Sequence, residues 1–150
     1  MDRRFPGARA GVGCALLVAL VGLAGCSGIK RIPTTGKVTL DGQPMTGGVL
    51  QFIPDVAKGN NLRLACSGPI SDGRWNLVTS GMERVNTGTG APVGWFKVIY
   101  THPTEGSKAP GASAAPNVAL KYRSEQTTPI SIELTDPPPA EGYKIELTSK

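Results

Sequence analysis

The fold of this 150-residue chain is decided by the stretch Trp95-Phe96-Lys97-Val98-Ile99-Tyr100-Thr101. Successive side chains of a strand point to opposite faces, so Phe96, Val98 and Tyr100 share one side. This period of two predicts a β-strand with one buried face. Trp95 belongs to the other set, and we expect it to face solvent or the edge of a second sheet.

Short alternations of the same kind recur on both sides of this stretch, separated by Gly, Pro and Asp-Gly pairs. We expect strands at residues 36–40, 48–54, 62–67, 75–77, 130–134 and 143–147, with a kink at Gly68-Pro69. Polar or Gly/Pro-rich loops are expected at residues 55–61, 81–94 and 102–117, and residues 118–124 allow at most a turn or two of helix. Asp41-Gly42 and Asp72-Gly73 predict tight turns. The pattern therefore predicts an all-β sandwich of about seven strands, whose core includes Phe52, Trp75, Phe96 and Val98.

The N-terminus has the layout of an export signal. Arg3, Arg4 and Arg9 precede an apolar run over residues 10–23, and small residues follow it. The run is 14 residues long, whereas a membrane-spanning helix needs roughly 20. A buried core helix would need a polar face, which this run lacks. One interpretation of this layout is an ordinary secretory signal in which the cysteine at its end occurs by chance.

The segment Leu23-Ala24-Gly25-Cys26 closes this run and resembles a bacterial lipoprotein box. The resemblance implies cleavage between Gly25 and Cys26 and attachment of lipid, such as palmitate, to Cys26. It divides the chain into a signal peptide (1–25), a tether (26–34) and a domain (35–150). Ser27 resembles the second residue of lipoproteins sorted to the outer membrane. Lys30-Arg31 would favour anionic headgroups or serve as a solvated pair in the linker.

Removal of the signal changes the charge and the cysteine inventory. It takes three of the 16 basic residues and one of the 11 acidic residues, so the formal net charge falls from +5 to +3. The remaining basic residues form no stripe with aromatics, which excludes nucleic acid as an expected partner. Cys14 leaves with the signal and Cys26 carries lipid, so Cys66 has no intramolecular disulfide partner. We expect its thiol to be buried in the core.

The order of several motifs resembles the carboxypeptidase regulatory-like domains. Residues 35–45 are similar to their opening G-x-V-x-x-D-G-x-P, and residues 47–54 continue it. Residues 71–77 resemble T-D-x-D-G-x-Y/F-x-L with one acidic residue missing, and residues 91–98 resemble L-P-x-G-x-Y-x-V. Lys121-Tyr122, then 128–130 and a last strand, resemble the tail of small lipoproteins with such a domain. The resemblance implies a transthyretin-like (prealbumin-like, Ig-like) sandwich of about seven strands and does not imply peptidase activity.

Residues for chemistry are few. His102 is the only histidine, whereas a zinc carboxypeptidase centre needs two His and one Glu. Gly-x-Ser-x-Gly is absent. Asp41, Asp55 and Asp72 are scattered singly, and turn chemistry explains two of them. We therefore predict no catalytic site, no metal and no cofactor.

Trp75 and Trp95 are candidates for stacking on sugars, with core burial favoured for Trp75. Trp95 and His102 are the candidate ligand-facing residues. The predicted function is a non-catalytic, lipid-anchored structural or binding module of the cell envelope. Its expected partners are the membrane through Cys26, and envelope polysaccharide or surface proteins. The alternative is an envelope hydrolase that uses His102 with a nearby carboxylate.

Overall fold

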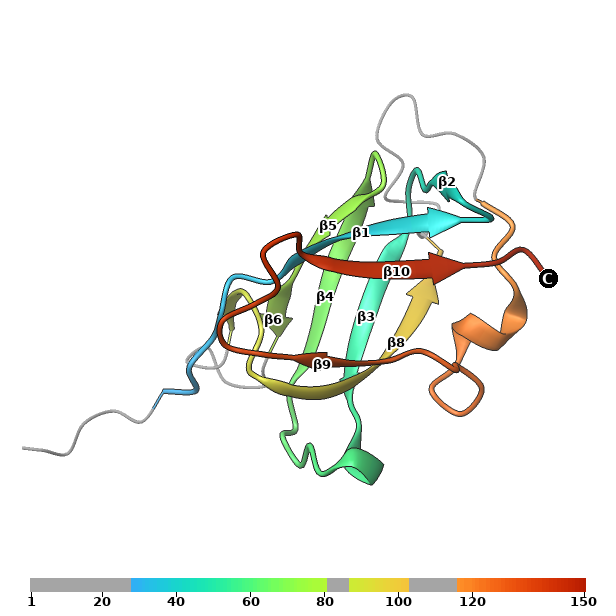
Figure 1. Cartoon of the computed structure of the whole chain (residues 1–150). Helices are drawn as coiled ribbons and strands as arrows, with labels where there is room; N and C mark the ends of the chain where they lie inside the picture. The colour runs from blue at the N-terminus through green and yellow to red at the C-terminus, as the bar shows by residue number, and fades with distance from the viewer. Residues whose placement is uncertain (1–27, 81–86, 103–115) are drawn as a thin grey trace, which may run out of the picture.

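A computed structural model describes residues 28–80, 87–102 and 116–150 of the protein, which form an all-β fold (Figure 1). The described strands are β1 (Thr35–Leu40), β2 (Gln43–Pro44), β3 (Val49–Pro54), β4 (Ala65–Ser71), β5 (Arg74–Asn76), β6 (Val78–Ser80), β7 (Gly88–Thr89), β8 (Gly94–Thr101), β9 (Ser131–Leu134) and β10 (Tyr143–Leu147). Two short 3-10 helices accompany them, η1 (Val56–Lys58) and η4 (Leu120–Arg123).

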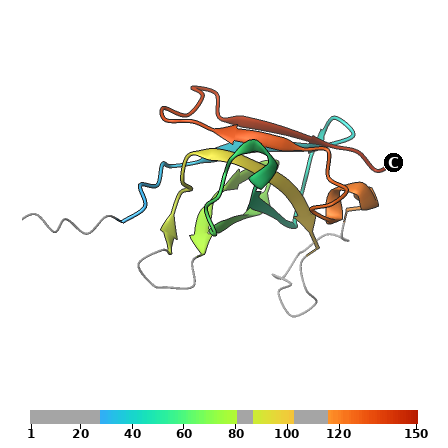
Figure 2. The same ribbon diagram turned by 90° about the horizontal axis from the view of Figure 1, so that it is seen from below.

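The strands form one curled sheet in the order β10-β1-β5-β4-β3-β8-β9. All neighbours on this path are antiparallel except β1 and β10, which run parallel. The curl brings the two ends of the sheet, β9 and β10, close to each other, as Figures 1 and 2 both show. The backbone N–H of Thr135 donates to the Tyr143 hydroxyl at 2.9 Å across this gap. The curled sheet therefore encloses a single interior.

The interior is filled by the side chains that the alternation assigns to it. The predicted core residues Phe52, Trp75, Phe96 and Val98 are all buried. The Phe52 ring lies 5.1 Å from the Trp75 ring and 6.4 Å from the Phe96 ring, centroid to centroid. Since aromatic side chains supply the largest apolar area per residue, this cluster contributes much of the stability. Cys66 is buried as predicted.

The two predicted Asp-Gly turns are confirmed. Asp41 and Gly42 have φ of 50° and 82°, and Asp72 and Gly73 have φ of 50° and 70°. Two successive positive φ values match the twist of the flanking strands in a hairpin. Hydrogen bonds from the side chain of Ser149 and from its backbone N–H, which donates at 3.1 Å, lower the pKa of the Asp41 carboxyl group.

Two predicted strands differ in the structure. The strand expected at 62–67 is β4 (Ala65–Ser71), which begins later and continues through Gly68 and Pro69. The strand expected at 75–77 is two strands, β5 and β6, which break at Leu77. The reason is a change of partner strand: β4 pairs with β6 up to Ser67 and with β5 from Ile70 onward.

The expected loops also hold more structure than predicted. η1 lies in the loop at 55–61, and β7 lies in the loop at 81–94, of which residues 81–86 are outside the described part. η4 falls where a turn or two was expected. Residues 103–115 of the loop expected at 102–117 are outside the described part as well.

The described residues before β1 pack against the domain. Ile32 and Thr34 are buried, and Ile32 forms a β-bridge with Ala91 through hydrogen bonds of 2.9 and 3.0 Å. Lys30 forms an ion pair with Asp136. The chain is therefore held to the domain from Lys30 onward, within the segment predicted to be the tether.

Candidate functional site

The first candidate site is a hollow at the start of β8, which we call the Trp95 hollow. It has a volume of about 520 Å³. Its lining is Lys58, Gly59, Asn60, Asn61, Leu62, Val93, Gly94 and Trp95. It thus joins the loop after η1 to the entry of β8, and it contains one of the two predicted ligand-facing residues, Trp95.

The indole of Trp95 is half-buried and one of its faces is covered. The ammonium of Lys58 lies 3.9 Å from the ring centroid, which is the geometry of a cation–π contact. Asn60 holds the loop in place, because its side-chain amide donates to the Trp95 carbonyl at 2.7 Å and its oxygen accepts from the N–H of Leu62. The ring therefore stands in a defined orientation at the rim of the domain.

The buried carboxylate of Asp55 supports this loop from behind. The backbone carbonyl of Asp55 accepts hydrogen bonds from the N–H groups of Lys58 and Asn60 at 3.0 and 3.1 Å. The backbone N–H of Asp55 donates to the Trp95 carbonyl at 2.9 Å. One carboxylate oxygen accepts from the Ser131 hydroxyl at 2.9 Å. The other oxygen has no hydrogen-bond partner among the residues that the structure describes. Asp55 is therefore a positioning residue of the Trp95 hollow.

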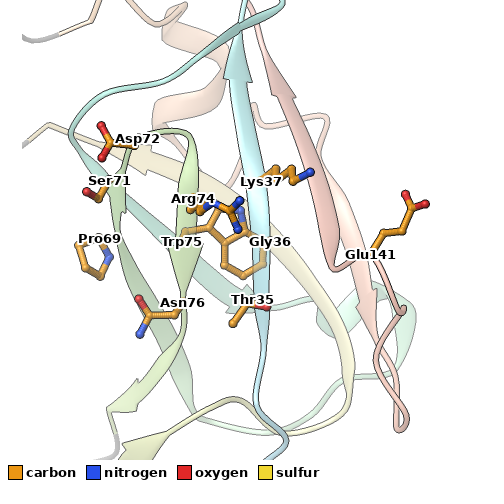
Figure 3. A pocket seen from close by; sticks show the side chains of 10 residues that line it. All are labelled: Thr35, Gly36, Lys37, Pro69, Ser71, Asp72, Arg74, Trp75, Asn76 and Glu141. Atoms are coloured by element: carbon orange, nitrogen blue, oxygen red, sulfur yellow. The ribbon is translucent and has the colours of Figure 1, made fainter.

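A second, open hollow of about 610 Å³ lies on the outer face of the sheet (Figure 3). We call it the strand-face hollow, and its lining is Thr35, Gly36, Lys37, Pro69, Ser71, Asp72, Arg74, Trp75, Asn76 and Glu141. Lys37 on β1 and Arg74 on β5 are directly opposite each other in the strand register. Like charges in that position repel.

The charges of the strand-face hollow balance. Asp72 stands at the turn beside Arg74, while Lys37 extends from β1 toward the side of Glu141 (Figure 3). Glu141 forms an exposed ion pair with Lys144 at 2.8 Å, and this hydrogen bond lowers the pKa of the Glu141 carboxyl group. The two basic and two acidic side chains of the lining give no strong preference for a ligand of either sign.

His102, the second predicted ligand-facing residue, lies just after β8, at the opposite end of that strand from Trp95. The structure therefore does not bring the two together. Nδ1 of His102 is 3.4 Å from the Tyr100 hydroxyl, and the two rings meet edge to face. Burial raises the pKa of the Tyr100 hydroxyl. Within residues 28–80, 87–102 and 116–150, no carboxylate forms an ion pair with His102.

The other residues singled out in the sequence fall in different places. Trp75 belongs to the core, and no hydrogen bond to its indole N–H is found in the described part of the chain. Burial raises the pKa of the Cys66 thiol, which lies 3.4 Å from the Thr79 hydroxyl. Gly25 and Cys26, the predicted cleavage and lipidation site, lie outside the described residues.

The described ranges hold no metal cluster and no helix that could span a membrane, and the chain matches no known family. No cluster of three or more His, Cys, Asp or Glu side chains that could hold a metal ion occurs in the described ranges. Nor does any helix in those ranges combine the length and apolar character needed to cross a membrane. No family model, no curated protein and no solved structure matches the chain.

Sequence reasoning missed Lys58, Asn60 and Asp55 as parts of the Trp95 hollow. Lys58 lies 37 positions from Trp95, in a loop whose polar composition is typical of any surface connection. The one available signal in the sequence was Trp95, which was expected to face solvent and which follows Val93 and Gly94 in the chain. This signal indicates where β8 begins, and it gives no information about the loop at residues 58–62 that lies beside it.

Proposed function

We propose that this protein is a non-catalytic module of the bacterial cell envelope, anchored to the outer membrane by lipid on Cys26. The box Leu23-Ala24-Gly25-Cys26 behind a basic, apolar leader supports this proposal. The same proposal includes a carboxypeptidase regulatory-like domain with a transthyretin-like sandwich. The order of its motifs from residue 35 to about residue 147 supports that part.

The observation that carries the proposal is the small number of residues between Cys26 and the packed domain. Only five residues separate Cys26 from Ile32, which is already buried against Ala91. An extended chain advances at most 3.3–3.6 Å per residue, so Ile32 lies within about 20 Å of a lipidated Cys26. A domain tied this closely works at the membrane surface, where one of its two hollows is available to envelope polysaccharide or to surface proteins.

The anchor is tested by mass spectrometry of the mature N-terminus, combined with membrane fractionation. The expected result is a chain that begins at lipid-modified Cys26 and sediments with the outer membrane. Cys26→Ser should abolish the modification and release the protein, whereas the matched control Cys66→Ser should leave both unchanged. An unmodified Cys26 in the wild-type protein, or membrane retention of Cys26→Ser, would refute the proposal.

A partner is tested by cross-linking in intact cells and by binding to isolated envelope polysaccharide. Alanine at Asn61 or Asn76 places one change in each hollow without removing a buried group. We expect one of the two to weaken the interaction selectively. Equal binding by both variants and by the wild-type protein would show that neither hollow serves the partner.

A further inference from the structure

The tether and the Trp95 hollow lie at the same end of the domain, according to two independent links. Ile32 bridges to Ala91, which is four residues before Trp95. Lys30 pairs with Asp136, two residues after Leu134, whose partner in the strand register is Gly94. The segment that leads to Cys26 therefore leaves the domain beside the hollow. In both ribbon views it leaves on the side away from η4 (Figures 1 and 2).

Apolar side chains are exposed around the same hollow. In the described part of the chain, three large hydrophobic residues are strongly exposed: Val56 by 67%, Val93 by 47% and Leu120 by 76%. Val93 lines the hollow, and Val56 begins η1, which ends at Lys58. Val93 is therefore part of the hollow, and Val56 lies two residues from Lys58, which covers the Trp95 indole.

The charged groups at this end are of both signs, four basic and three acidic. The basic residues are Lys30, Arg31, Lys58 and Arg63, and the acidic ones are Asp55, Glu133 and Asp136. Asp55 is buried and hydrogen-bonded to Ser131, and Asp136 is paired with Lys30. Glu133 is exposed and opposite Trp95 in the strand register. This surface, which we call the tether face, thus combines an indole, two exposed valines and one more basic than acidic residue.

We propose that the tether face rests on the membrane surface, with Trp95 and Val93 at the level of the lipid headgroups and Lys58 beside anionic phosphates. The inference depends on the lipid anchor of the proposed function. Indole rings favour the membrane interface because one part is apolar and the N–H is polar. Basic residues near the bilayer are attracted to anionic lipids. Such a contact would supply a membrane attachment in addition to the lipid on Cys26.

A membrane explains the tether face better than a sugar does. The Lys58 ammonium lies 3.9 Å over one face of the indole, so a sugar has only the other face on which to stack. The tether brings the tether face close to the bilayer, since Ile32 is within about 20 Å of Cys26. A glycan bound in the Trp95 hollow would have to fit between the domain and the membrane.

The experiment measures tryptophan emission of the lipidated full-length mature protein in vesicles. The vesicles contain phosphatidylglycerol and phosphatidylcholine, with or without bromine on the acyl chains as a quencher. The chain has two tryptophans, so Trp95→Phe leaves only the buried Trp75. We expect quenching by brominated lipid in the wild-type protein and its loss in Trp95→Phe. Equal quenching in both, or none in either, would overturn the inference.

Three further variants distinguish a defined contact from general adhesion. Val93→Asn should reduce the quenching, whereas Leu120→Asn, a matched change of an exposed residue at the η4 end, should not. Lys58→Gln should weaken the quenching in phosphatidylglycerol vesicles and have little effect in pure phosphatidylcholine. Equal effects of Val93→Asn and Leu120→Asn would contradict a defined tether face.

Two controls separate the possible failures. Mass spectrometry of the same sample establishes whether Cys26 carries lipid. A protein without lipid overturns the proposed anchor, whereas a lipidated protein whose Trp95 is not quenched overturns only the membrane contact. If isolated peptidoglycan fragments, and not vesicles, shift the Trp95 emission, the hollow binds glycan and the inference is wrong.

Discussion

Replacement of Gly36 by alanine should destabilise the domain strongly, although Gly36 has an ordinary strand conformation. A Cβ atom at this position would lie 2.3 Å from the Tyr143 carbonyl oxygen and 2.4 Å from Cζ2 of Trp75. Both contacts are far below the normal separation of such atoms. One obstacle is backbone and the other is a buried ring, so neither can move freely.

The position of β1 makes this clash costly. β1 lies between β5 and β10, and Gly36 is paired with Trp75 on one side and with Tyr143 on the other. The two rings also stack, with centroids 6.4 Å apart. Relief of the clash must therefore move a strand or rotate Trp75 out of the core. Overpacking of this kind costs about 1–3 kcal/mol, from a total stability of about 5–15 kcal/mol.

The assay is unfolding in urea and by heat, followed by the emission of Trp75 and Trp95. We expect the midpoint temperature to fall by about 4–12 °C, which corresponds to the predicted loss for a domain of this size. Gly28→Ala is the matched control, because nothing lies within 4 Å of its added Cβ atom. A Gly36→Ala protein whose midpoint equals that of Gly28→Ala would refute the packing argument.

Four other predictions address Cys66, Ser131 and His102. Burial raises the pKa of the Cys66 thiol, so the folded protein should react slowly with iodoacetamide at pH 8 and the unfolded protein quickly; equal rates would contradict the buried position. Because this pKa is raised in the folded state, the thiol's contribution to stability should be complete below its unfolded pKa of about 8.5 and should decline as the pH rises above it. Unfolding curves of the wild type and of Cys66→Ala at pH 7 and pH 10 measure this decline. Ser131→Ala removes the hydrogen bond to the buried Asp55 carboxylate and should cost about 1–3 kcal/mol in urea unfolding, whereas Ser71→Ala on the exposed face should cost less than about 0.5 kcal/mol. His102→Ala should complement a deletion strain as well as wild type does, and a loss of function would favour the envelope hydrolase.

The sequence was sufficient for features that depend on neighbouring residues. Alternation placed β1, β3, β8, β9 and β10 close to their observed positions, because a half-buried strand needs apolar side chains at every second residue. The Asp-Gly turns followed from the positive φ that their geometry requires. The burial of Phe52, Trp75 and Cys66 followed from the same local patterns.

Local patterns failed where a strand changes partner. β4 changes its partner from β6 to β5 and continues without a break through Gly68-Pro69. The interruption lies instead in the facing chain, at Leu77 between β5 and β6. Gly68 permits this because a Cβ atom there would lie 2.4 Å from the Asn76 carbonyl oxygen. The glycine thus marks a close approach of two backbones, whereas the sequence alone suggested a kink.

By itself, the sequence determined the all-β class and the burial of Phe52, Trp75, Phe96, Val98 and Cys66, because each depends on short-range composition and spacing. Only the tertiary structure brought Lys58 over Trp95, Asp55 to Ser131 and the tether beside both. These contacts join residues 37, 76 and 106 positions apart. Their formation depends on the curl of the sheet, which closes the ends of the strands around one core and decides which loops meet.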